Sequence, residues 1–267
     1  MRKLAAVARA YSLGMLTYRT RTLVSLLSVL VAVVPVYFVA GALQPLAASA
    51  IASESTEYFT YLIVGSVASF VMAEAVSAIP SLINSYIVSG TLEQLLATPI
   101  TWPSLIAGLS TYGFGWVAIR ALVLLVTAWV WATSTIAWPR LFEFGAIMSL
   151  LALAYVGVGL VAGSLVLAVR SSLFVPQGVL TLSALLGTVY FPVAVLPPAF
   201  APFASMVPMT PALRAARQVL LKDAPLSAIG PELLSLVLWA AGGVVVGGLC
   251  FHQALRHARR AGTLTQY

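Results

Sequence analysis

The sequence has 267 residues, of which 61% are hydrophobic and only 8% are charged. Soluble domains carry roughly a quarter charged residues, so this composition and a mean hydropathy of +1.03 indicate a protein with several membrane spans. The net charge is +7, but the basic residues are placed to orient membrane spans, so we expect no nucleic-acid partner. A single cysteine, Cys250, excludes a disulfide framework, and His252 and His257 lack metal-ligand spacing, so we expect no metal site.

Residues 2–21 mix five basic residues with apolar ones, which predicts an amphipathic helix in the membrane surface. No small-residue cleavage site follows, so we do not expect a removable signal peptide. Six apolar runs come next, and a helix of about 20 residues crosses a hydrocarbon core of about 30 Å. The predicted spans are 22–43, 58–85, 103–132, 142–169, 173–196 and 232–251. We therefore predict an all-α membrane protein with six transmembrane helices.

A short polar segment, residues 89–99, separates the second span from the third. Thr91 and Gln94 have the spacing of a capping box, in which each side chain satisfies a backbone donor of a new helix. Glu93 lies in the first turn, where a negative charge suits the helix dipole, and Pro99 ends the helix. Leucines at positions 92, 95 and 96 line one face. The pattern predicts a two-turn amphipathic helix that docks on a partner.

The stretch 197–225 contains six prolines, which divide it into pieces too short to cross a bilayer. Thr210 and Pro211 form a helix start, because a capping hydroxyl precedes a proline at the first helical position. We predict a re-entrant hairpin followed by an interfacial helix.

Six spans place both termini on one side of the membrane. Taking that side as the cytoplasm gives nine basic residues inside and four outside, as the positive-inside rule requires. The nine are Arg2, Lys3, Arg9, Arg19, Arg21, Arg170, Arg256, Arg259 and Arg260, and the four are Arg140, Arg214, Arg217 and Lys222. This orientation places the segment 89–99 in the cytoplasm.

Residues 90–100, GTLEQLLATPI, resemble the cytoplasmic coupling-helix motif of ABC-2 type transporter permeases. The layout is similar too, with a basic N-terminal connecting helix, six spans and a proline-broken hairpin before the last span. Residues 206–217, MVPMTPALRAAR, resemble the family's second motif, with Val207-Pro208 where the family more often has Asn-Pro. The resemblance covers essentially the whole chain and treats 1–267 as one transmembrane domain.

The resemblance implies a non-catalytic permease of an ATP-driven exporter in the cytoplasmic membrane, paired with a second permease and two ABC ATPase subunits. It implies no cofactor in this chain, because ATP and Mg would bind to the ATPase. The sequence agrees, since it contains no G-x-x-x-x-G-K-[ST] phosphate loop. The resemblance assigns the following residues to ATPase coupling: Gly90, Thr91, Leu92, Glu93, Gln94, Leu95, Leu96, Thr98 and Pro99.

Glu74 and Arg120 are the two charged residues predicted to lie deep within spans. An ionised side chain there costs about 2.5–3.5 kcal/mol on insertion scales, so each needs a partner or water. Both lie near mid-depth of antiparallel neighbours, and we predict that they form an ion pair. The pair would either stabilise the fold or belong to the translocation path or its gate.

Arg214, Arg217 and Lys222 are predicted on the outer side, in or near the interfacial helix. They would either extend to lipid headgroups or contact the anionic headgroup of an exported amphiphile near a lateral exit.

The alternative function is a stand-alone channel or ion-coupled transporter that uses Glu74 as a proton or cation site. Association with an ATPase subunit distinguishes the two. Drugs, lipids and lipid-linked glycans all use this architecture, and short outer loops with few polar residues in the spans favour an amphiphilic or hydrophobic substrate over a hydrated polymer.

Overall fold

The computed structural model describes residues 19–90, 102–132, 136–169 and 174–260, in which all regular secondary structure is helical. Short 3-10 turns, Trp138–Arg140, Val193–Val195 and Leu226–Ile229, lie between some of the longer helices. The predicted all-α class is thereby confirmed. The α-helices are α2 (Arg19–Ile51), α3 (Tyr58–Val88), α5 (Trp102–Trp131), α6 (Leu141–Val169), α7 (Phe174–Leu186), α8 (Ala201–Met206), α9 (Met209–Lys222) and α10 (Gly230–Arg260).

Five stretches in the described part of the chain are long and apolar enough to cross a membrane. They correspond to the first four predicted spans and the last one. The first exceeds its prediction, because α2 continues through Pro35 and Pro45 to Ile51; helices in lipid tolerate proline where neighbouring groups satisfy the freed carbonyls. The stretches are Leu23–Ile51, Tyr58–Val88, Gly113–Trp131, Trp138–Leu167 and Leu226–His257.

The fifth predicted span, 173–196, is not one continuous helix. In its place α7 has 13 residues, which rise about 20 Å, less than a hydrocarbon core of about 30 Å. The helix ends where Gly187 N–H bonds to the Ser183 carbonyl and Thr188 takes a left-handed φ of 61°. The chain then runs through turns and the 3-10 helix Val193–Val195 before α8. The prediction of a helix reaching residue 196 is therefore wrong.

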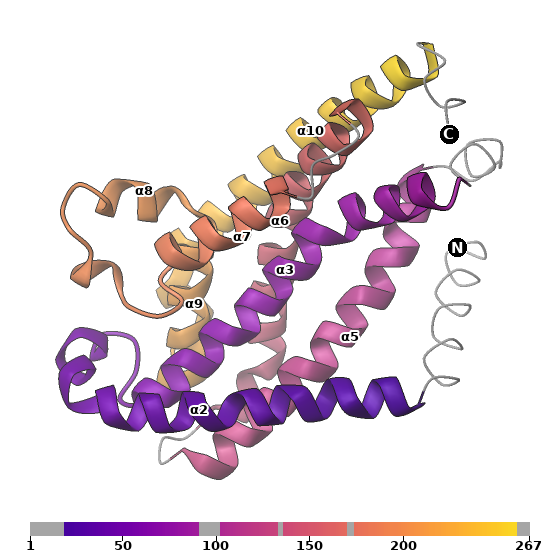
Figure 1. Cartoon of the computed structure of the whole chain (residues 1–267). Helices are drawn as coiled ribbons and strands as arrows, with labels where there is room; N and C mark the ends of the chain where they lie inside the picture. The colour runs from indigo at the N-terminus through magenta and orange to yellow at the C-terminus, as the bar shows by residue number, and fades with distance from the viewer. Residues whose placement is uncertain (1–18, 91–101, 133–135, 170–173, 261–267) are drawn as a thin grey trace.

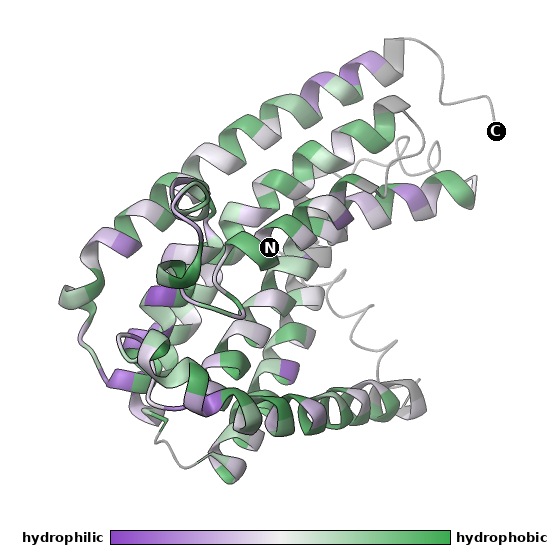
Figure 2. Cartoon of the chain, turned by 60° about the vertical axis from the view of Figure 1, so that its left-hand side comes forward, coloured by the Kyte–Doolittle hydropathy of each residue, from purple (hydrophilic) through white to green (hydrophobic). Residues whose placement is uncertain are grey.

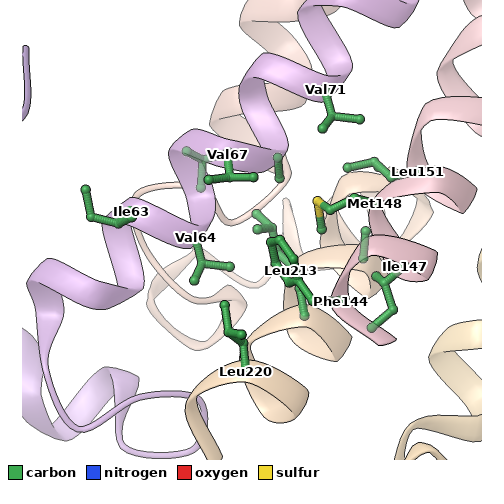
Figure 3. Close-up of a cluster of buried hydrophobic side chains, with 14 of the residues drawn as sticks. Ile63, Val64, Val67, Val71, Phe144, Ile147, Met148, Leu151, Leu213 and Leu220 are labelled. Atoms are coloured by element: carbon green, nitrogen blue, oxygen red, sulfur yellow. The ribbon is translucent and has the colours of Figure 1, made fainter. Parts of the chain in front are cut away.

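The core lies around α3 and α6. In each of them 61% of the span is buried, against 17% for α2 and for α10. Figure 3 shows side chains from α3, α6 and α9 meeting in this core, among them Val64, Phe144 and Leu213. Figure 2 shows α2 as hydrophobic along most of its length, and many of its large apolar side chains are exposed. Such a helix needs lipid or another protein around it.

Glycines bring α6 and α10 into direct backbone contact. A Cβ at Gly157 would collide with the backbone of Gly243, and a Cβ at Gly247 would collide with the Gly157 carbonyl. Small residues allow this close approach, which replaces the hydrophobic driving force that is missing between helices in lipid. The contact fixes α10 against the core despite its exposed outer face.

The two ends of the helix bundle differ in the segments that they hold. The terminal end holds the end of α3, the start of α5 and the end of α10 (Figure 1). The loop end is the opposite one, and it holds residues 51–58, 131–132, 136–141, 187–193 and 222–230. Hydrogen bonds hold these segments in place: Ala137 N–H donates to the Leu220 carbonyl of α9, and the Tyr58 hydroxyl donates to the Tyr190 carbonyl.

Candidate functional site

Of the predicted coupling helix, residues 89–99, the part from 91 to 99 lies outside the described residues. The structure does describe the two helices that it connects. α3 ends at Val88, and Gly90 follows with its N–H bonded to the Ile87 carbonyl and a left-handed φ of 66°, which favours glycine. α5 begins at Trp102. The segment therefore joins α3 to α5 at the terminal end of the bundle.

Glu74 and Arg120 do not form the predicted ion pair. The carboxyl group of Glu74 packs on Gly113 of α5, where an added Cβ would overlap it. Gly113 and Arg120 are seven residues apart on the same helix, which corresponds to about 10 Å along its axis. The two helices are neighbours, as predicted, but the carboxyl group of Glu74 lies against Gly113, while the Arg120 guanidinium lies over Phe70. The expectation of a direct pair is therefore wrong in this conformation.

Arg120 points toward α2 and toward aromatic rings. One of its terminal nitrogens donates a 2.7 Å hydrogen bond to the Ser25 hydroxyl. Its guanidinium carbon lies 5.3 Å from the centre of the Trp116 ring and 5.9 Å from that of Phe70. Cation–π contacts of this kind become stronger when the cation is removed from water. Arg120 thus joins α2, α3 and α5 without a carboxylate partner in the described residues.

Arg217 is completely buried, which contradicts its predicted position among outer headgroups. The reason is that α9 packs within the bundle: ten of its 14 residues are buried, and it contacts α3, α6 and α10. One terminal nitrogen of Arg217 donates a 2.9 Å bond to the Glu54 carboxylate, which is itself buried. Because a buried charge needs a partner, Glu54 is what allows an arginine here.

Backbone carbonyls and an aromatic ring complete the surroundings of Arg217. Its other terminal nitrogen donates to the carbonyls of Tyr61, Thr188 and Val189 at 3.0–3.3 Å. The guanidinium carbon lies 3.3 Å from the centre of the Tyr61 ring. Burial lowers the pKa of Arg217, while Tyr61 and Glu54 act in the opposite direction. One side chain thereby ties α9 to the α2–α3 loop, to α3 and to the segment after α7.

Arg214 and Lys222, the other two predicted headgroup contacts, have different environments. The ammonium group of Lys222 donates a 2.8 Å bond to the Ala52 carbonyl in the α2–α3 loop. Arg214 and Lys222 are both exposed at the surface of the described chain, and no hydrogen bond or ion pair is seen for Arg214 within the described residues.

An ion-pair cluster lies beside α9 at the loop end. Arg140 bonds to Glu143 at 3.0 Å and also pairs with Asp223. Asp223 has a left-handed φ of 52° and forms the C-cap of α9. The cluster therefore fixes the end of α9 to the start of α6.

A lateral groove opens between α5 and α6. These helices make almost no direct contact, but both pack on α3. The resulting groove has a volume of about 610 Å³, with Val67 and Val71 of α3 as its floor and residues between 114 and 125 of α5 and between 141 and 156 of α6 as its walls. Ser149 is the only lining residue with a polar side chain, and its hydroxyl already donates to the Gly145 carbonyl.

Glu74 lies where this lateral groove ends. Val67, Val71 and Glu74 are spaced as i, i+4 and i+7, so they follow one face of α3 toward the terminal end. Gly113, on which the carboxyl group packs, directly precedes Phe114, a residue of the groove wall. An apolar groove and an intramembrane carboxyl group are therefore adjacent.

Sequence reasoning missed Glu54, Gly113 and the groove itself. Glu54 lies between the first and second predicted spans, and a six-span topology puts that loop on the same side of the membrane as Arg217, which was a usable signal for their pairing. Gly113 carries no signal, because its role depends on the register between α3 and α5. The groove arises because α5 and α6 scarcely pack against each other, and the hydropathy of a sequence does not predict which helices are in contact.

Comparison with known families places the chain. Residues 2–221 match the profile of the ABC-2 type transporter family. No curated protein matches the sequence. The match spans most of the chain, including the segment 89–99 and most of α9, and it agrees with the multi-span helical architecture. The protein therefore belongs to the ABC-2 type transporter family.

Proposed function

We propose that this chain is the transmembrane permease subunit of an ATP-driven exporter in the cytoplasmic membrane, with both termini in the cytoplasm. The observation that carries the proposal is the family match over residues 2–221. Charge distribution supports the orientation, because the terminal end would carry the excess of basic residues. α7 and the segment that follows it would together form the one crossing of the six that the five long apolar stretches do not supply.

Residues 90–99 are proposed to transmit the motion of an ATPase subunit. They connect α3 to α5, and α3 is one of the two most buried spans. A push at this connection would therefore act on the centre of the bundle and not on a peripheral helix. Each permease would engage one ATPase, so a pair of permeases would require two ATPase subunits, which hold the ATP and Mg.

The permease is proposed to work as a dimer with itself or a related chain. Support comes from α2, which contacts α3 and α5 on one side and exposes large apolar residues such as Leu27, Val31 and Phe38 on the other. In a membrane this face can bind lipid or a second permease.

The substrate is proposed to be amphiphilic or hydrophobic. The lateral groove is apolar and opens on the side of the bundle, and the described spans have few polar side chains. Such surroundings do not compensate a hydrated polymer for the water it would lose.

Purification from native membranes and reconstitution test this function. The ATPase should co-purify with the permease, and proteoliposomes that contain both should move the substrate only when ATP is hydrolysed. Transport that proceeds without an ATPase, and that depends on an ion gradient and on Glu74, would replace the exporter with the ion-coupled alternative.

A further inference from the structure

We propose that the lateral groove binds a lipophilic cation, with its hydrophobic body between α5 and α6 and its positive charge at Glu74. The inference rests on the proposed function, since it names the substrate class of that permease.

Glu74 lacks the direct polar partner that an intramembrane carboxylate favours. Within the described ranges it has neither an ion pair nor a hydrogen bond, and its carboxyl group packs on Gly113. Carboxylates with direct ion-pair partners lie at the loop end, where Glu54 is paired with Arg217 and Glu143 with Arg140. A carboxylate without a direct partner in an apolar environment favours a ligand that supplies a positive charge.

The nearby cation does not pair directly with Glu74. The charge of Arg120 acts on Glu74 only through space, because its guanidinium is engaged by Ser25, Trp116 and Phe70. Arg120 does not line the lateral groove, which lies between α5 and α6. A cationic ligand in the groove would therefore approach Glu74 without passing Arg120.

The lateral groove has the size and chemistry of a small-molecule site. Its volume of about 610 Å³ falls within the range of about 300–1,000 Å³ that such sites occupy. Its rim is open along exposed residues of both walls, including Ala118, Leu122 and Leu153. Hydrophobic compounds concentrate in the bilayer, so a ligand can enter sideways from lipid.

The carboxylate of Glu74 favours a cation over a lipid tail as the ligand of the lateral groove. An acyl chain would fill the apolar groove and gain nothing from a carboxylate at its end. An anion would be repelled. A hydrophobic cation gains from both features, since its body leaves water and its charge finds the unpaired carboxylate.

Binding of tetraphenylphosphonium to the full-length permease in nanodiscs tests this assignment, with triphenylphosphine oxide as an uncharged analogue. The cation should bind more tightly than the analogue. Glu74→Gln should raise the Kd of the cation about tenfold or more, as expected for loss of a desolvated charge partner. Glu74→Asp, which keeps the charge, should retain most of the affinity, and Glu232→Gln on α10 should leave it unchanged.

A second variant tests the groove independently of the charge. Gly145 lines the lateral groove, and an added Cβ would have no atom within 4 Å, so Gly145→Phe should place a ring in the groove without disturbing the core. It should weaken the cation and the uncharged analogue alike. Gly242→Phe is the matched control, because Gly242 is also open but lies on α10. Unchanged unfolding temperatures would show that the variants fold.

Equal affinities of the cation for the unchanged protein and for Glu74→Gln would overturn the assignment, as would equally tight binding of the uncharged analogue. The assay contains neither ATPase nor ATP, so its result is independent of the exporter proposal. Charge-dependent binding alongside ATP-independent transport would sustain the site and reject the exporter. ATP-driven export with no effect of Glu74→Gln on cation binding would support the exporter and reject the cation site.

Discussion

The guanidinium of Arg217 and the carboxylate of Glu54 meet at 2.9 Å, both buried, although 163 positions separate them in the chain. The contact fastens α9 to the loop between α2 and α3. Beside it, the same arginine holds the backbone after α7. Three segments that hydropathy treats as independent are thus joined by one side chain.

Breaking this pair on one side should destabilise the protein strongly. Arg217→Met leaves a buried carboxylate without its partner, and Glu54→Leu leaves a buried guanidinium, so each should cost about 3–5 kcal/mol. The double variant should lose less than the sum of the two, because neither charge remains. Thermal unfolding in detergent measures all three proteins. Arg214→Met is the control and should change stability by less than about 0.5 kcal/mol, since Arg214 is exposed. Strictly additive losses would mean that the pair is not coupled.

The α6–α10 contact should depend on Gly157. Gly157→Ala forces a methyl group into the Gly243 backbone, and overpacking of this kind costs about 1–3 kcal/mol. Gly242→Ala adds the same methyl group where no atom lies within 4 Å, so it should be neutral or slightly stabilising, as alanine is in helices. Unfolding temperatures compare the two. If both variants unfold at the same temperature, the close approach is not what holds α10.

Gly113 should report on the position of Glu74. Gly113→Ala places a Cβ where the Glu74 carboxyl group lies and should cost about 1–3 kcal/mol. Shortening Glu74 to alanine in the same protein should recover most of the loss, as the unfolding temperature will show. Gly115→Ala is the matched control, because no atom lies within 4 Å of its added Cβ. No recovery in the double variant would place Glu74 elsewhere.

Exchanging the charges of Glu74 and Arg120 should not repair the damage of the single reversals. The two positions face different neighbours, so Glu74→Arg would press a longer side chain on Gly113, and Arg120→Glu would turn a carboxylate toward Ser25 and two aromatic rings. The yield of folded protein and the transport rate in proteoliposomes measure the effect of each variant. Restoration of both in the double reversal would show that a direct pair forms in another conformation.

Leu95→Asp should separate ATP hydrolysis from transport. A charge on the predicted leucine face would have to be buried in an ATPase cleft, so export should fall at least about tenfold while the permease still folds. Transport and ATPase rates in the same proteoliposomes measure both. Ser85→Asp, on an exposed position of α3, is the control. Undiminished export by Leu95→Asp would remove residues 90–99 from the coupling role.

Features that depend on local composition could be predicted from the sequence, whereas features that depend on register could not. Length and hydropathy located α2, α3, α5, α6 and α10 because lipid imposes one rule on every span. The mispairing of Glu74 with Arg120 arose because depth alone does not set which faces of α3 and α5 meet.

α9 was mistaken for the opposite reason. Its arginines and small residues have the pattern of an interfacial helix. That pattern contains no information on Glu54, the distant carboxylate that allows Arg217 to be buried in the core. The fifth span failed because its hydropathy continues past Leu186, while the left-handed Thr188 ends the helix.

The bonds from Arg217 to residues 188 and 189 go to carbonyl oxygens, which every amino acid possesses. The contact with Arg217 therefore places no demand on the side chains at those two positions, which are restricted only by burial and by the left-handed φ of residue 188. Position 65 has no such freedom, since any Cβ there would collide with the Val189 carbonyl and crowd the guanidinium. An alignment of related chains should accordingly show Glu54, Gly65 and Arg217 changing together or not at all.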